Sequence, residues 1–258
     1  MRLPFVSRFT GTIAILFVFL GASVGGAETR VGSTVESRVL VGFKVNDAAI
    51  DATLPEGWSS ITLPQGPLGG SNLIVALIDR HLIVDANGTP QQPSSGPIVA
   101  FLAYARNSDI EGLRGFVTRV YEESPLVDPY RNSVAADIDR IAGYSDAGGG
   151  ERSQSERWSV LTEAGDVLAL ELDFKVGGFR WATDGESRPY SAKDPNFFRI
   201  YRYDQLAGLV MNAAMGQTLD GTFTVAAKGP DLSQLFDGSE LLTAIVSIPT
   251  YVREISLP

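Results

Sequence analysis

The region from Arg157 to Lys175 constrains the fold more than any other part of the sequence. Two runs rich in β-branched, aromatic and leucine residues flank the short turn Ala164-Gly165-Asp166, and this is the pattern of a β-hairpin. In the second run, Leu168–Phe174, an apolar residue occupies every second position. A period of two residues suits a strand with one buried face and does not suit an amphipathic helix. The region therefore predicts a half-buried strand pair.

The rest of the chain repeats this character. Helical periodicity is scarce: we expect a short helix over 46–52, capped by Asn46-Asp47, and 204–212 and 231–236 are the best further candidates for short helices. A loop rich in turn residues is expected over 85–96. Many short strands separated by turns predict a mainly β (α+β) fold, with one domain over 28–258 and the architecture of a barrel or a sandwich. The other β-rich runs cover 36–43, 73–84, 97–104, 115–121, 197–203, 221–227 and 240–255.

The N-terminus has the pattern of a secretory leader. Arg2 and Arg8 precede an apolar run over 13–20, and Gly25 and Ala27 fit the small-x-small rule for cleavage. We therefore expect residues 1–27 to be a signal peptide cleaved after Ala27, and the mature protein to be secreted or periplasmic. The apolar run is shorter than the about 20 residues of a spanning helix, although an uncleaved anchor is the alternative. No integral membrane segment is expected after cleavage.

Charge and residue usage exclude several classes of function. Loss of Arg2 and Arg8 with the leader takes the formal net charge from −9 to −11, which argues against nucleic acid as a partner. The chain has no cysteine and one histidine, so that a Cys/His zinc site and a cysteine nucleophile are excluded. A Ser-His-Asp triad would need that histidine, His81. We expect neither a metal nor a cofactor.

Arg199 stands among aromatic residues in the run over 197–203. At strand spacing it shares a face with Phe197, Tyr201 and Tyr203. An arginine in this setting can hold a substrate carboxylate or stack on a ring. A surface arginine that keeps its charge in water is the alternative, and strand register decides between the two.

Both ends of the mature chain resemble the acetoacetate decarboxylase-like superfamily. The segment 38–57, a strand leading into a short helix that ends at Leu54-Pro55, is similar to the beginning of those proteins. The segment 221–258 is similar to their end, and Asn196-Phe-Phe-Arg-Ile200 to the strand that precedes their last third. The resemblance implies a conical antiparallel β-barrel with a few short flanking helices and a pocket in the cone.

The chemistry of that family depends on a lysine in a Pro-Lys motif, whose amine forms a Schiff base with a β-keto acid. The matching region here, 115–133, contains no lysine. Asp128-Pro129-Tyr130-Arg131-Asn132 occupies the place of the motif, with Arg131 nearest the lysine position. Because arginine stays protonated, it cannot act as an amine nucleophile. The sequence therefore predicts a divergent member that lacks the Schiff-base lysine motif.

Three functions remain open. The first is a binding protein or degenerate enzyme, in which Arg131 or Arg199, together with Tyr121, holds a small organic acid or keto compound. The second is a lyase- or hydratase-type enzyme, in which Arg131, with Tyr121 or Tyr130 and Glu122 or Glu123, polarises a carbonyl and moves protons. The third is a non-catalytic interaction protein of the cell envelope. A homo-oligomer is compatible with all three.

Overall fold

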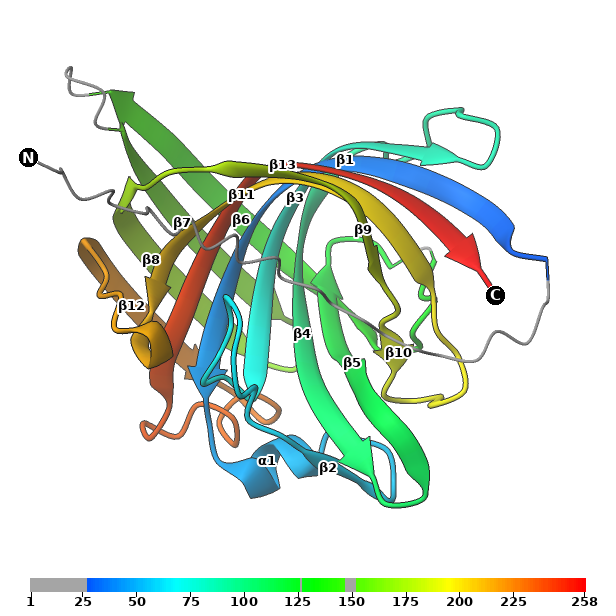
Figure 1. Cartoon of the computed structure of the whole chain (residues 1–258), viewed down its shortest axis with the longest axis horizontal. Coiled ribbons are helices and arrows are strands. Elements are labelled where there is room, and N and C mark those ends of the chain that lie inside the picture. The colour runs from blue at the N-terminus through cyan, green and yellow to red at the C-terminus, as the bar shows by residue number, and fades with distance from the viewer. Residues whose placement is uncertain (1–26, 126, 147–151) are drawn as a thin grey trace, which may run out of the picture.

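The computed structural model of the chain describes residues 27–125, 127–146 and 152–258 (Figure 1). The expected signal peptide lies outside these residues, apart from Ala27. The helices of this part are α1 (Asp47–Asp51) and the 3-10 helix η1 (Ala213–Met215). No helix within these ranges is long and apolar enough to cross a membrane. The strands are β1 (Thr29–Lys44), β2 (Trp58–Ser60), β3 (Leu73–Asp85), β4 (Gly96–Asn107), β5 (Ile110–Glu122), β6 (Ser133–Asp146), β7 (Arg152–Thr162), β8 (Val167–Val176), β9 (Arg180–Ser187), β10 (Tyr190–Ser191), β11 (Ile200–Asn212), β12 (Gly221–Lys228) and β13 (Leu241–Leu257).

Hydrogen bonds join all of these strands into one sheet. Its path is β12-β8-β7-β6-β5-β4-β3-β1-β13-β11-β9, with β10 beside β5 and β2 beside β4. The pairs are antiparallel except that β5 is parallel to β6 and to β10. Figure 1 shows the sheet strongly curved. The mainly β class is confirmed. Within the described residues the end strands β12 and β9 do not pair with each other, so the sheet is not closed by hydrogen bonds.

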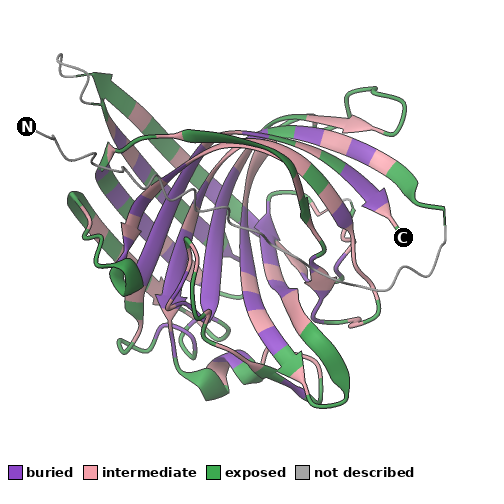
Figure 2. Ribbon diagram, viewed as in Figure 1, coloured by how far each residue is buried: buried purple, intermediate pink, exposed green. Residues whose placement is uncertain are grey.

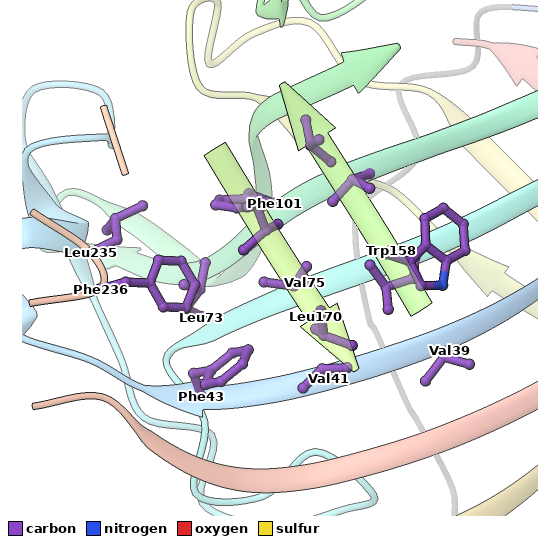
Figure 3. Packing of buried hydrophobic residues seen from close by; sticks show 14 of the residues in the cluster. Val39, Val41, Phe43, Leu73, Val75, Phe101, Trp158, Leu170, Leu235 and Phe236 are labelled. Carbon is purple, nitrogen blue, oxygen red and sulfur yellow. The ribbon is translucent and has the colours of Figure 1, made fainter. Parts of the chain in front are cut away.

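The main hydrophobic core lies between the long strands β1, β3, β4 and β13 on one side and the β7–β8 hairpin on the other (Figure 3). Val41 and Phe43 of β1 and Val75 of β3 meet Trp158 of β7 and Leu170 of β8 in this core. Burial of each such side chain contributes about 1.5–3 kcal/mol relative to exposure. The hairpin is confirmed, and the alternating residues of β8 are all buried, as predicted: Leu168, Leu170, Leu172 and Phe174.

The long strands are also buried on their second face (Figure 2). Because successive side chains of a strand point to opposite faces, Leu40 faces away from Val39 and Val41, and it packs in other apolar clusters. The segment between β5 and β6 and the segment around β10 cover this second face. Ser191 Oγ of the latter donates a hydrogen bond of 2.5 Å to the backbone oxygen of Tyr130 of the former. The sheet therefore has a second interior.

Local predictions succeeded where a local signal decides the structure. Asn46 caps α1, since its side chain accepts a hydrogen bond from the backbone N–H of Ala48. The helices expected over 204–212 and 231–236 were wrong. The first range belongs to β11, which is held on both sides by β13 and β9. The second is a run of turns that places Leu232, Leu235 and Phe236 in the core.

Candidate functional site

A cluster of charged and phenolic side chains lies on the second face of the sheet. Glu36 of β1 is at its centre, with Arg80 of β3 and Tyr251 of β13 as its register partners across the strands. Two further members, Tyr130 and Arg199, come from the covering segments. We call this set the arginine–tyrosine cluster. It consists of Thr34, Glu36, Arg38, Arg80, Glu122, Tyr130, Arg199, Tyr201, Tyr251 and Arg253.

The carboxylate of Glu36 is completely buried. Arg38 Nε donates a hydrogen bond of 2.6 Å to its Oε2, Arg253 Nη2 one of 2.8 Å to its Oε1, and the Thr34 hydroxyl one of 2.6 Å to the same Oε1. Burial by itself would raise the pKa of Glu36, but the two guanidinium groups and the hydroxyl outweigh it and hold the pKa at about 2. Glu36 is therefore an anion at neutral pH, and it orients two arginines.

Tyr130 and Tyr201 form a hydroxyl pair beside these arginines. Their phenolic oxygens are 2.5 Å apart, and the Arg253 guanidinium lies 4.2 Å from the centre of the Tyr201 ring. Burial and the neighbouring Tyr201 raise the pKa of Tyr130 well above its usual value. One hydroxyl donates to the other, so the pair retains one proton that it can donate to a ligand oxygen.

Arg199 contributes a cation that has no carboxylate partner among the described residues. It is half-buried, and its buried Nε makes no hydrogen bond within this part of the chain. Its charge acts directly on Tyr130. Burying a charged donor without a partner is costly, so this arrangement suits a site that is completed by an anion.

Glu122 and Arg80 extend the cluster toward the end of β5. The shortest distance between their charged atoms, Arg80 Nη1 to Glu122 Oε2, is 3.7 Å. Burial raises the pKa of Glu122, against the opposing effects of Ser133 and Arg80. A carboxyl group with a raised pKa is suited to proton transfer, and it shares this face with the tyrosine pair.

The other residues singled out in the sequence lie elsewhere. Arg131 is on the surface, with 76% of its side chain exposed, and its nearest carboxylate is Asp194 at 3.9 Å. Tyr121 lies in the main core on the opposite face of the sheet, where burial raises its pKa to about 12. Glu123 is exposed, and His81 is half exposed with Nδ1 3.7 Å from Asp79. The structure thus brings Tyr130, Glu122 and Arg199 together and leaves the others apart.

A second buried carboxylate, Glu156 of β7, has a different environment. Arg140 donates two hydrogen bonds of 3.1 Å to it, Gln154 one of 2.8 Å and Trp158 one of 3.0 Å. Arg140 also donates a hydrogen bond to Asp79. Every one of these charges has a partner, so we assign this group a structural role. Within the described residues no three His, Asp or Glu side chains are placed to hold a metal ion.

Solved structures of similar fold provide the comparison. No family model and no curated protein matches the sequence. An acetoacetate decarboxylase-like enzyme from Sphingomonas wittichii RW1 superposes with a TM-score of 0.55 at 13% identity, over 95% of this chain and 98% of that one. The enduracididine biosynthesis enzyme MppR complexed with pyruvate gives 0.54 at 11% identity, over 88% of each chain. The acetoacetate decarboxylase of Legionella pneumophila gives 0.51 at 8%, over 94% and 91%.

The fold is acetoacetate decarboxylase-like. The residue that follows Pro129 is Tyr130, whose hydroxyl enters the arginine–tyrosine cluster. Lysine side chains are absent from that cluster. None of the chain's four lysines is buried: Lys44, Lys175, Lys193 and Lys228.

Seven of the ten residues of the cluster were not among the sequence candidates. Thr34, Glu36 and Arg38 occupy alternate positions of a strand that is otherwise rich in valine, and this polar face was the available signal. Arg253 carried no local signal, because its importance comes from Glu36, which lies 217 positions earlier in the chain.

Proposed function

We propose that this chain is an exported acetoacetate decarboxylase-like protein that binds a small organic acid or keto compound without forming a Schiff base. The ligand carboxylate contacts Arg199, and its carbonyl oxygen accepts a hydrogen bond from the Tyr130–Tyr201 pair. The observation that carries the proposal is the guanidinium of Arg199, which has no carboxylate partner in the described chain, stands two residues before Tyr201 and acts on Tyr130. Pyruvate, bound by the fold neighbour MppR, is a suitable first ligand.

Titration calorimetry of the mature protein with pyruvate tests the binding site. We expect saturable binding by the wild type. Arg199→Gln should bind pyruvate at least about ten times more weakly, because a charged hydrogen bond is lost. Arg202→Gln is the matched control, since Arg202 is an exposed arginine of β11 already paired with Glu28 and Glu186. Equal affinity of Arg199→Gln and the wild type would contradict the assignment.

Borohydride trapping tests the absence of a Schiff base. A Schiff base between pyruvate and a lysine would be reduced to a stable adduct that mass spectrometry detects. We expect no adduct, because the four lysines are outside the cluster and none is buried. An adduct on any lysine would refute this part of the proposal.

Export is tested separately by the N-terminal sequence of the protein recovered from an expressing cell. The leader predicts a mature chain that begins at Glu28 and is found in the periplasm or the medium. An intact Met1 in the cytoplasmic fraction would contradict export.

A second candidate is an enzyme that moves protons at the carbon next to the carbonyl. It is favoured by Glu122, whose raised pKa and position on the face of the tyrosine pair suit a general base. Exchange of the methyl protons of pyruvate in deuterated water, followed by NMR, measures this activity. The candidate requires exchange that is lost in both Tyr130→Phe and Glu122→Gln; exchange no faster than in buffer would exclude it.

A further inference from the structure

The charges of the arginine–tyrosine cluster do not balance. Its arginines number four and its glutamates two, in a chain whose formal net charge is −9. Arg38 and Arg253 share one carboxylate, that of Glu36, and Arg80 takes the other, that of Glu122. The cluster therefore carries two positive charges in excess. One belongs to the Arg38–Glu36–Arg253 group and the other to Arg199.

Both excess charges act on the tyrosine pair. Arg253 lies over the ring of Tyr201, at 4.2 Å from its centre, and Arg199 stands two residues before Tyr201 in the chain. The charges of both arginines also act on Tyr130, whose hydroxyl oxygen is 2.5 Å from that of Tyr201. Two cations therefore accompany one hydroxyl pair.

Neighbouring carboxylates do not cancel this excess. Asp128 accepts backbone hydrogen bonds of 3.1 and 3.0 Å from Asn132 and Ser133, and its charge acts on Glu122. Glu123 acts on Arg80 from an exposed position. The charged groups that act most strongly on Tyr130 are both cations, Arg199 and Arg253.

We infer that the preferred ligand is a short dicarboxylate with a keto or hydroxyl oxygen between its two carboxylates. One carboxylate pairs with Arg199, the other with the Arg253 side of the cluster, and the oxygen between them accepts a hydrogen bond from the tyrosine pair. A dianion would neutralise the cluster, whereas a monocarboxylate would leave one excess positive charge. The inference rests on the proposed function and narrows its ligand class. Arg38 and Arg253 keep 12% and 11% of their side chains exposed, so this side of the cluster is not fully sealed from solvent.

A pair of probes that differ by one charge tests the inference directly. The pair is 2-oxoglutarate and its 5-methyl ester, which keeps the open chain and the keto group but lacks the second negative charge. Titration calorimetry at neutral pH and low salt is expected to show that 2-oxoglutarate binds at least about ten times more tightly, because the ester lacks one charged contact. Pyruvate is titrated in parallel.

Variants then locate the second charge. In Arg199→Gln the ratio of the two affinities is expected to fall toward one, and in Arg199→Lys, which keeps the charge, it stays well above one. Arg202→Gln leaves the ratio unchanged. Circular dichroism verifies that each variant is folded, and the wild-type ratio alone decides the inference if a variant is not.

The outcomes separate this inference from the proposed function. A ratio near one, with pyruvate and both probes bound, overturns the dicarboxylate inference and leaves the proposed function intact. Binding of none of the three ligands overturns both. A high ratio that is unaffected by Arg199→Gln overturns the assignment of the second charge to Arg199.

Discussion

Replacing Glu36 with glutamine should destabilise the protein strongly and in a pH-dependent way. The pKa of Glu36 lies at about 2 instead of 4.5, and that difference corresponds to about 3 kcal/mol of folding stability at neutral pH. The glutamine would also leave Arg38 and Arg253 without a carboxylate, and removal of one partner from a buried ion pair costs about 3–5 kcal/mol. We expect Glu36→Gln to lose about 3–5 kcal/mol at pH 7.

The pH dependence follows from the direction of the shift. Because folding lowers the pKa of Glu36, its contribution is complete above pH 4.5 and is lost as the pH falls toward 2. Urea unfolding of both proteins between pH 7 and pH 3 measures this loss. The difference in unfolding free energy between wild type and variant should be about 2 kcal/mol smaller at pH 3 than at pH 7.

An exposed carboxylate provides the control. Glu171 of β8 is 61% exposed and lies 3.9 Å from Arg157, so Glu171→Gln should cost less than about 1 kcal/mol and should not change this pH profile. The reasoning would be refuted if Glu36→Gln were as stable as the wild type at pH 7. It would also be refuted if the difference between the two proteins stayed constant down to pH 3.

Three other changes test the core, the turns and the cluster. Leu170→Ala should lower the unfolding free energy by about 2–5 kcal/mol in a urea titration, because it leaves a cavity in the main core. Gly229→Ala should lower the melting temperature more than Gly88→Ala: both glycines have positive φ, but only at Gly229 would a Cβ meet another atom, Asp166 Oδ1, at 2.4 Å. Equal shifts would contradict this. Arg199→Met should leave thermal stability unchanged or slightly higher while pyruvate binding is lost; a loss of more than about 2 kcal/mol would mark Arg199 as structural.

The sequence predicted those parts of the fold whose signal is local. The alternation in Leu168–Phe174 predicted both the strand and its buried face, because one side of β8 packs on the main core. It did not predict β6 or β9. Only Ala136 and Ile138 are buried in β6, and no residue of β9 is buried, so neither strand shows a strict alternation. These strands are specified by hydrogen bonds to their neighbours, which leave no pattern in a single sequence.

Only those residues of the candidate site that have a local sequence signal were predicted. Arg199 stands among aromatic residues, and Tyr130 follows Pro129 in the segment compared with the Pro-Lys motif. Arg131, next in the chain to Tyr130, points to solvent, since its backbone turns there with a φ of +57°. Which of two adjacent residues enters the interior depends on this turn and not on residue type.

The two buried carboxylates differ in how far the charges around them are balanced. Glu156 accepts hydrogen bonds from three side chains, and its arginine is also held by Asp79. Glu36 is equally buried, but its arginines belong to a cluster with excess positive charge that ends at Arg199. A protein that needed only stability would lose little by replacing such an arginine with an apolar residue of similar size. The Arg199 guanidinium, whose buried Nε has no hydrogen-bond partner in the described chain, is therefore the charge that the proposed ligand would neutralise.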